Sequence, residues 1–296
     1  MLVFVVIGLF LGKSISLAPI PPENNLSVPK PIIFVLGGDV MLGRMVSWKL
    51  KQAGDYSSLF SNLKNTWADA DMVMMNLESP LYSNCEVKNS TSMRFCAEPV
   101  FAKVLADADI THVSFANNHI LDYGGVGVEE TNSLLSENGI TVANHATPVL
   151  SEVDNKKIGF VSWNLTWNNV ADKEIRLKIN ALRNKADLAV VNFHWGEEYT
   201  DEPNEYQKQI AHLAVDSGAD IVIGHHPHHL QPVEEYKGKL IFYSLGNLIF
   251  DQLWSEKTRY GMLVRVEWNP QQNTMFYTTS TTYMKDWAEA ALVNQP

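Results

Sequence analysis

Residues 219–234 read ADIVIGHHPHHLQPVE and place four histidines directly after a short apolar run. The run, residues 221–223, contains β-branched side chains and is typical of a buried strand. The histidines are His225, His226, His228 and His229. Pro227 lies between them and stiffens the loop, because its ring fixes φ. Imidazole is a common neutral metal ligand. The stretch therefore predicts a metal-binding loop past a strand end, and a histidine-rich surface loop is the alternative.

The same pattern, an apolar run that ends in polar side chains, recurs along the chain. Such runs cover residues 32–36, 72–77, 110–116, 188–193, 221–223 and 240–244. Apolar residues at three- and four-residue spacing predict helices at residues 57–68, 100–108, 126–138 and 205–217. Alternating strands and helices favour an α/β fold with a buried parallel or mixed sheet. Residues 262–268 and 274–282 alternate in the manner of edge strands instead.

The composition is that of a globular protein: 296 residues, 46% hydrophobic and 19% charged. A net charge of −10 argues against a nucleic-acid partner, which would require a basic patch. An anionic ligand must therefore be attracted by a local positive site, such as a metal ion. Because the chain shows no repeat and no second composition regime, we expect one domain over residues 31–296.

The first eleven residues, MLVFVVIGLFL, form an apolar run that is too short to span a bilayer as an ordinary helix. Its length suits the core of a signal peptide. We predict that residues 1–18 are a signal peptide or an N-terminal anchor and that the proline-rich residues 19–30 are a linker. Either form of the N-terminal segment implies an extracytoplasmic protein, in the periplasm or at the cell surface. A buried N-terminal strand is the alternative.

The two cysteines of the chain, Cys85 and Cys96, lie in one polar loop, NCEVKNSTSMRFC. In an oxidising compartment we expect them to form a disulfide that closes a small ring. Such a ring contributes on the order of 2–3 kcal/mol to stability. Two unconnected free thiols are the alternative.

Several of the predicted strands end in residue types that bind metals. These residues are Asp39, Glu78, Asn118, His194 and the histidine cluster. In open α/β sheets, ligands bind outside the carboxyl ends of the strands, so we expect these side chains to lie together. Carboxylate, amide and imidazole ligands without a thiolate suit Mn²⁺, Fe²⁺ or Zn²⁺. The donors outnumber the needs of one ion, which indicates two divalent metal ions about 3.5–4 Å apart.

Six blocks of sequence resemble, in order and spacing, the signature blocks of one protein family. They are GDVMLGR (38–44), NLE (76–78), ANNHILDYG (116–124), HWGEEY (194–199), GHHPH (224–228) and YSLGN (243–247). The family is the bacterial capsule-synthesis CapA, or poly-γ-glutamate synthesis, proteins, which are related to the calcineurin-like metallophosphoesterases. The resemblance implies a metallophosphoesterase-like fold, a four-layer α/β/β/α sandwich, with a dinuclear metal site at the strand ends.

The resemblance also assigns roles to individual residues. It implies that Asp39 and His228 bind one ion, that Glu78 bridges both ions, and that Asn118, His194 and His226 bind the second ion. His119 would be the general acid for the leaving oxygen. Asp122 would orient the imidazole of His119. By strand alternation we expect His225 and His229 to face away from the ions.

Two further residues, Arg44 and Asn247, are candidates for binding the substrate. Arg44 lies in the first block and could contact an anionic group with both of its guanidinium nitrogens. A surface salt bridge is the alternative for Arg44. For Asn247, support of the site from behind and capping of a loop are the alternatives.

The first two blocks depart from the wider superfamily. Its usual Asp-x-His reads Asp39-Val40-Met41 here, and its usual Gly-Asp is replaced by Asn76-Leu77-Glu78. One ion therefore loses a histidine ligand. Two functions stay open: a metal-dependent hydrolase of phosphoester-type bonds in envelope polymer metabolism, or a non-catalytic accessory protein for export or assembly of an anionic polymer. A membrane polymer-synthase complex is a candidate partner in both cases.

Overall fold

The computed structural model of the protein describes residues 30–166 and 170–293. The predicted signal peptide or anchor, and the predicted linker apart from Lys30, lie outside the described residues. From Pro31 onward the chain forms one compact unit. Within the described ranges, no helix combines the length and the apolar character that crossing a membrane requires.

The larger of the two sheets has eight strands. Its order is β14 (Glu289–Leu292), β13 (Thr274–Asp286), β12 (Tyr260–Asn269), β1 (Ile32–Val40), β2 (Met72–Leu77), β3 (His112–Phe115) and β4 (Thr141–Asn144), and β11 (Asn247–Ile249) pairs with β1 outside this path. Strands β1 to β4 run parallel, whereas β12, β13 and β14 pair antiparallel. The carboxyl ends of β1, β2 and β3 therefore meet at one edge of this sheet.

The second sheet has six strands. Its order is β5 (Val149–Val153), β6 (Lys156–Asn164), β7 (Leu188–His194), β8 (Ile221–His225), β10 (Lys239–Phe242) and β9 (Val233–Tyr236). The four central strands are parallel, and the edge strands β5 and β9 are antiparallel to their neighbours. Its carboxyl edge holds the ends of β7 and β8, where the sequence predicted histidine ligands.

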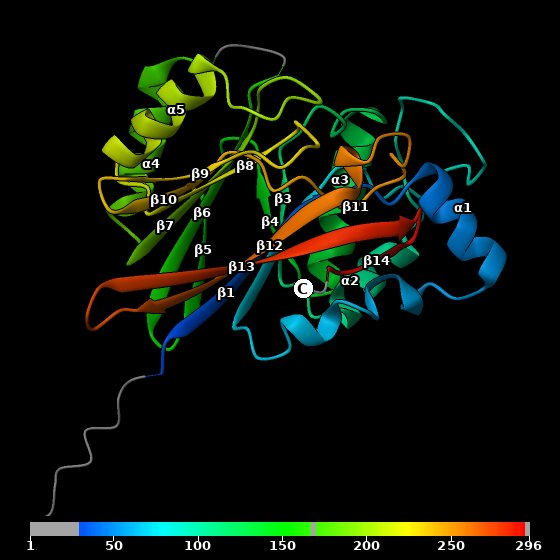
Figure 1. Cartoon of the computed structure of the whole chain (residues 1–296), viewed down its shortest axis with the longest axis horizontal. Helices are drawn as coiled ribbons and strands as arrows, with labels where there is room; N and C mark the ends of the chain where they lie inside the picture. Colours follow the sequence, from blue (N-terminus) through cyan, green and yellow to red (C-terminus); the bar gives the residue numbers. More distant parts are fainter. Residues whose placement is uncertain (1–29, 167–169, 294–296) are drawn as a thin grey trace, which may run out of the picture. The chain divides into compact units, whose positions relative to one another are not determined.

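Helices cover the outer face of each sheet (Figure 1). The larger sheet packs against α1 (Arg44–Ala53), α2 (Val100–Asp107) and α3 (Gly124–Glu137), and the smaller sheet packs against α4 (Asp172–Arg183) and α5 (Glu205–Asp216). A third apolar core lies between the two sheets. The order of layers is therefore helix, sheet, sheet, helix, which confirms the predicted four-layer sandwich.

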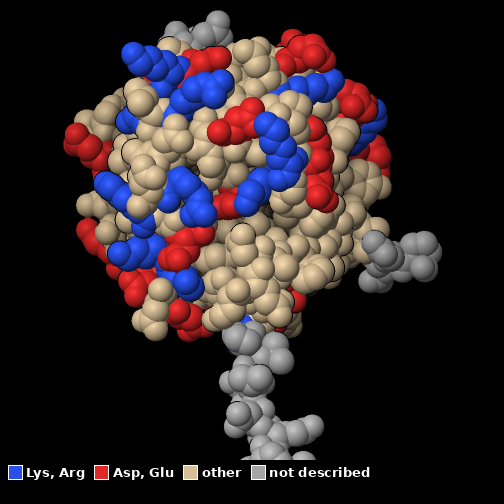
Figure 2. Space-filling view, turned by 90° about the vertical axis from the view of Figure 1, so that its left-hand side faces the viewer, with Lys and Arg blue, Asp and Glu red and all other residues tan. Residues whose placement is uncertain are grey.

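Side-chain alternation along the central strands explains the three cores. In β1, Phe34 packs between the sheets and its neighbour Val35 packs against the helices. In β8, Ile223 packs between the sheets and Val222 packs against the helices. Because both faces of these strands are covered, their sequences are continuous apolar runs rather than alternating ones. Figure 2 shows acidic and basic side chains interspersed on one outer face, where neither sign dominates.

The helix predicted for residues 57–68 is wrong. Two short 3-10 helices, η1 (Ser57–Phe60) and η2 (Lys64–Thr66), occupy this stretch. The Asp55 carboxylate accepts hydrogen bonds from the backbone N–H and the hydroxyl of Ser57. Such local side-chain bonds compete with the helical backbone pattern. Conversely, α1 and α4 were not predicted, and a third 3-10 helix, η3 (Lys257–Arg259), follows β11.

Candidate metal centre

The structure brings together all six residues predicted to bind metal. They are Asp39, Glu78, Asn118, His194, His226 and His228, from the ends of strands in both sheets or the loops that follow them. Asn118 Oδ1 lies 2.7 Å from His194 Nε2, and Asp39 Oδ2 lies 3.3 Å from His228 Nδ1. The cluster is buried, since Asp39 and Glu78 are both 0% exposed. Two sheets thus contribute to one centre, while the ligand roles of these residues stay predictions.

An irregularity in β1 sets the position of Asp39. The pairing of β1 with β2 shifts register between Leu36 and Asp39, and Asp39 then pairs with Asn247 of β11. A side chain on Gly38 would place its Cβ 2.1 Å from the carbonyl oxygen of Gly246. Only glycine therefore allows β1 and β11 to approach so closely. The Asp39 carboxylate, which follows directly, accepts a 2.8 Å hydrogen bond from Asn76 Nδ2.

The histidine loop after β8 has an unusual backbone. His226 and His228 adopt positive φ angles of 98° and 56° on either side of Pro227. Such conformations are costly for non-glycine residues and persist only where the surroundings enforce them. Here the backbone N–H of His226 donates to Asp39 Oδ2 at 3.2 Å, and the Pro227 carbonyl accepts from the Tyr199 N–H at 2.8 Å. The loop is thereby held against the first strand of the other sheet.

The expectation that His225 faces away from the centre is wrong. Its Nδ1 lies 3.0 Å from Asp39 Oδ1, without the alignment of a hydrogen bond. Regular strand alternation ends at His226, where φ becomes positive, so the alternating pattern no longer predicts side-chain direction. His229 instead contacts Asp201, with 3.1 Å between Nδ1 and Oδ1.

Glu78 is the clearest indication of a bound cation. Neither of its carboxylate oxygens has a hydrogen-bond partner within the described part of the chain. Three imidazole nitrogens surround Oε1: His228 Nε2 at 3.7 Å, and Nε2 of His119 and of His194 at 4.0 Å each. These separations are too long for hydrogen bonds. Two metal–ligand bonds of about 2.0–2.2 Å can span roughly 4 Å, so the donors fit a divalent ion.

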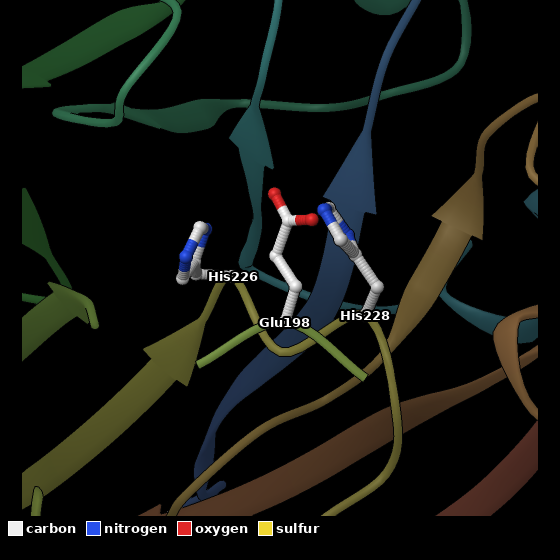
Figure 3. Close-up of side chains that lie close together, drawn as sticks. All are labelled: Glu198, His226 and His228. Atoms are coloured by element: carbon white, nitrogen blue, oxygen red, sulfur yellow. The ribbon is translucent and has the colours of Figure 1, made fainter. Parts of the chain in front are cut away.

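A carboxylate that sequence reasoning missed, Glu198, completes a second group of donors. Glu198, His226 and His228 form one group whose donor atoms all lie within 4.8 Å of one another, and Asp39, Glu78 and His194 form the other. Figure 3 shows the Glu198 side chain between the two imidazoles. Glu198 lies in a tight turn. Gly196, two residues before it, and Tyr199, directly after it, both have positive φ. The adjacent pair Glu197-Glu198 was a signal, but a loop has no periodicity that separates the two.

Burial and neighbouring charges shift the pKa values of the cluster residues in opposite directions. Burial favours a raised pKa for Asp39, but His225 and His228 outweigh it and hold that pKa well below its usual value. Burial raises the pKa of Glu78 well above normal and lowers the pKa of His226 to about 3. Burial opposes protonation of His228 too, yet Glu78 and Asp39 raise its pKa to about 9. Asp39 and His226 are therefore already in the forms that bind metals.

The predicted general acid, His119, lies at the rim of the cluster and is 6% exposed. Its Nδ1–H donates to Asp122 Oδ2 at 2.8 Å. This leaves Nε2 as the nitrogen that faces Glu78. The ring stacks on Phe95, with 3.8 Å between ring centroids. The geometry suits the predicted roles of His119 and Asp122, which stay predictions.

The two predicted substrate-binding residues have partners within the protein. Arg44 forms a bidentate ion pair with Asp251, and its guanidinium carbon lies 4.6 Å from the Phe95 ring centroid. Asn247 is 0% exposed. Its Oδ1 lies 2.9 Å from His228 Nδ1, and its Nδ2 donates to the Thr258 carbonyl at 2.9 Å. Asn247 is thus placed to orient His228, and direct contact of either residue with a substrate stays a prediction.

The predicted disulfide between Cys85 and Cys96 is confirmed, with 5.8 Å between the two Cα atoms. It closes a loop between β2 and α2, and Phe95 of this loop stacks on His119. The parallel bridge between Leu81 and Ala97 holds the base of this loop.

The paired sheets and the helices that flank them form an α/β sandwich with a metallophosphoesterase-like fold. Comparison with known proteins specifies the family. The family model of the bacterial capsule synthesis protein PGA_cap matches residues 33–252, and the chain belongs to this family. The resemblance to CapA proteins is thereby confirmed.

Two curated relatives are similar over most of the chain. The PGA biosynthesis protein CapA of Bacillus subtilis (strain 168) is 35% identical over 255 residues, which are 77% of this chain and 65% of that protein. The capsule biosynthesis protein CapA of Bacillus anthracis is 31% identical over 89% of this chain and 69% of its own length. The chain thus spans about two thirds of the length of these relatives.

Two solved structures share the fold at low sequence identity. A novel phosphatase from Mycoplasma pneumoniae has a TM-score of 0.56 and 14% identity, over 86% of this chain and 95% of that one. A hypothetical protein from Thermus thermophilus has a TM-score of 0.54 and 14% identity, over 84% and 99%. At this identity the similarity concerns the fold.

Proposed function

We propose that this protein is an extracytoplasmic, metal-dependent hydrolase that acts on a phosphoester-type bond during synthesis of an anionic envelope polymer. The observation that carries the proposal is Glu78, a fully buried carboxylate with no hydrogen-bond partner among the described residues. An unpaired buried carboxylate is costly, whereas one placed between two cations is stabilised. The residue types around Glu78 suit two divalent ions of Mn²⁺, Fe²⁺ or Zn²⁺.

The chain's own residues divide the proposed work between binding and proton transfer. The ions would be held by Asp39, Glu78, Asn118, His194, His226 and His228, and Glu198 would add a further carboxylate. Bound divalent ions stabilise the negative charge that develops on a reacting phosphoryl group. His119 delivers a proton from Nε2 to the leaving oxygen, because Asp122 already holds the Nδ1–H.

The cellular setting is inferred from the family and from the disulfide. The relatives carry names that refer to capsule or PGA biosynthesis. Disulfides persist in oxidising compartments outside the cytoplasm, so the Cys85–Cys96 bond supports export. The substrate in this proposal is a phosphoester linked to an anionic polymer such as poly-γ-glutamate, and a membrane polymer-synthase complex is the partner.

A second candidate function, a non-catalytic metal-binding accessory protein for polymer export or assembly, is favoured by one observation. Met41 stands where the wider superfamily has a histidine, and it is fully buried in the core beside α1. Its thioether is a poor ligand for hard or borderline ions. One of the two proposed ions is then held less tightly. A centre that easily loses one ion is less suited to catalytic turnover than to binding a polymer.

Metal analysis combined with a phosphodiesterase assay separates the two functions. The purified full chain is loaded with Mn²⁺, its metal content is measured by mass spectrometry, and turnover of bis(p-nitrophenyl) phosphate is followed. His119→Gln is expected to retain the metal and to lose on the order of a hundredfold in kcat. His212→Gln is the matched control, because His212 also pairs with a carboxylate, Glu234 at 2.8 Å, but lies outside the centre.

Each outcome of this experiment selects one function. Turnover that requires His119 while the metal stays bound supports the hydrolase. Stoichiometric metal without turnover of any phosphoester supports the accessory protein. A chain that binds no divalent ion at all would overturn the assignment of the centre itself.

A further inference from the structure

We infer that Phe95, held by the Cys85–Cys96 disulfide, is a positioning residue for His119. The loop of residues 80–97, in which the disulfide closes residues 85–96, would then be part of the candidate metal centre rather than a surface insertion beside it. The consequence for catalysis rests on the proposed function. The placement of the His119 ring by Phe95 does not, and it can be tested by itself.

The aromatic contact between Phe95 and His119 is the first support. The two rings are stacked, with 3.8 Å between centroids and 22° between planes. Phe95 is 1% exposed, and it also meets Phe250 edge to face at 5.9 Å. A flat ring that is itself fixed by packing limits rotation of the imidazole on it. The stack thus fixes the plane of the His119 ring.

The backbone of the same residue fixes the other partner of His119. The Phe95 N–H donates a 2.6 Å hydrogen bond to Asp122 Oδ2, the oxygen that also accepts from His119 Nδ1. The neighbouring Arg94 donates from Nε to the Asp122 carbonyl. The loop therefore positions the imidazole through its face and the carboxylate through a hydrogen bond. Both contacts act on the direction of His119 Nε2.

The disulfide and the base of the loop fix the position of Phe95. Backbone hydrogen bonds fasten the base of the loop: Ala97 donates to Pro80, and Tyr82 donates to Ala97. The loop between the cysteines contains no helix and no strand. Cys96 directly follows Phe95, and its bond to Cys85 shortens the free length of the loop. On the other side, a Cβ on Gly43 would lie 2.4 Å from the Cys96 carbonyl oxygen, so the first block also packs tightly on this segment.

The test reads the position of the His119 ring by nuclear magnetic resonance. In the full chain labelled at histidine ring carbons, the His119 resonance is assigned as the signal that disappears in His119→Gln. A proton above an aromatic face is shifted upfield, so we expect an upfield signal for the wild-type chain. The signal should move downfield in Phe95→Leu and in the double variant Cys85→Ser/Cys96→Ser. Phe95→Tyr keeps the ring and should keep the shift.

Kinetics then test the catalytic consequence. With a phosphodiester substrate, Phe95→Leu and the double variant Cys85→Ser/Cys96→Ser are expected to lower kcat on the order of ten- to hundredfold. A small misplacement of a reacting group has effects of that size. KM and metal content should change less than twofold. The matched control is Phe60→Leu, the same substitution in the same core, where the ring meets Trp67 edge to face.

The outcomes distinguish this inference from the proposed function. A His119 signal that is unchanged in both Phe95→Leu and the cysteine double variant overturns the positioning role. If the double variant fails to fold, Phe95→Leu decides by the ring-nitrogen shifts of His119, which report whether Nδ1 still donates to Asp122 and depend little on the ring current of Phe95. Unchanged ring-nitrogen shifts in Phe95→Leu overturn the positioning role. A wild-type chain without turnover, but with a signal that moves in the variants, overturns the hydrolase and leaves the positioning role supported. Equal loss of kcat in Phe60→Leu would assign the effect to general destabilisation and overturn the inference.

Discussion

The core between the two sheets and the ligand cluster at the strand ends are equally buried, but they have opposite chemistry. Phe34 and Asp39 belong to the same strand, β1, and they are 1% and 0% exposed. Phe34 is surrounded by apolar residues of both sheets. Asp39 contacts histidines and an asparagine. Burial therefore shows only that a side chain is inside, and its partners show whether it stabilises the fold or forms a site.

Two histidines show the same contrast. His112, in β3, is 6% exposed, and burial lowers its pKa to about 4. His228 is 2% exposed, yet the carboxylates of Glu78 and Asp39 raise its pKa to about 9 against the effect of burial. The neutral hydroxyls next to His112 cannot compensate a buried charge, whereas two carboxylates can.

The largest effect is expected in the apolar core. Phe34→Ala should lower the free energy of unfolding by about 3–5 kcal/mol, because it removes a fully buried ring and leaves a cavity. Denaturant titration measures the loss. Metal stoichiometry of the folded fraction should be unchanged, since Phe34 packs in the apolar core between the sheets. A variant that also lost its metal would show that the two regions are not independent.

Glu78→Gln should weaken metal binding strongly and change the stability of the metal-free chain little. If Glu78 bridges two ions as proposed, its replacement should weaken metal binding at least about a hundredfold, or roughly 3 kcal/mol. Because the pKa of Glu78 is raised, the metal-free chain should change by less than about 1 kcal/mol.

Isothermal titration with Mn²⁺ and melting of the metal-free chain measure the two effects of Glu78→Gln. Glu98→Gln, a carboxylate that pairs with Lys51 outside the cluster, is the control. Unchanged metal affinity in Glu78→Gln would contradict a bridging role for this residue.

His112 predicts a pH dependence of stability. Its pKa is lowered on folding from 6.5 to about 4, so its contribution is present above pH 6.5 and is lost as the pH falls toward 4. The size is about 3 kcal/mol. The free energy of unfolding of the metal-free wild-type chain should therefore fall by that much more than that of His112→Gln over this range.

Denaturant titrations at several pH values, with the cluster histidines present in both proteins, measure the His112 contribution as a difference. Parallel pH profiles of the wild-type chain and His112→Gln would show that His112 titrates normally in the folded state.

The smallest effect is expected for Asn247→Ala. Asn247 orients His228 from behind, and loss of such a partner typically weakens metal binding ten- to hundredfold, about 1.4–2.7 kcal/mol. If Asn247 instead binds substrate, as predicted from sequence, KM rises and metal affinity stays unchanged. Comparison of Mn²⁺ titration with the KM for a phosphodiester distinguishes these results.

Particular residues show how far the sequence predicts this protein. The apolar runs of β1, β2, β7 and β8 are strong signals, because strands covered on both faces need apolar residues throughout. The disulfide followed from two cysteines in one loop. The helix at residues 57–68 was misassigned because polar side chains favour local turns there, and α4 was missed although Ile175, Ile179 and Leu182 have helical spacing.

The sequence also predicts some residues of the candidate site and misses others. Residue types at strand ends predicted Asp39, Glu78 and the histidines, because parallel strands deliver their carboxyl ends to one edge. Glu198 was missed, and the direction of His225 was mispredicted. Both lie where backbone φ becomes positive nearby, at Tyr199 and His226, and there sequence periodicity no longer indicates direction.

The sequence by itself determined the α/β class, the family and the residue types of the candidate metal site, because these depend on residue type and order. The tertiary structure alone decided which donors face one another and which carry protons. It also decided that the disulfide loop reaches His119 through Phe95. The physical reason is that pKa values and ligand geometry depend on distances between segments far apart in the chain. Glu78 and His228 are 150 residues apart in sequence but 3.7 Å apart at the centre.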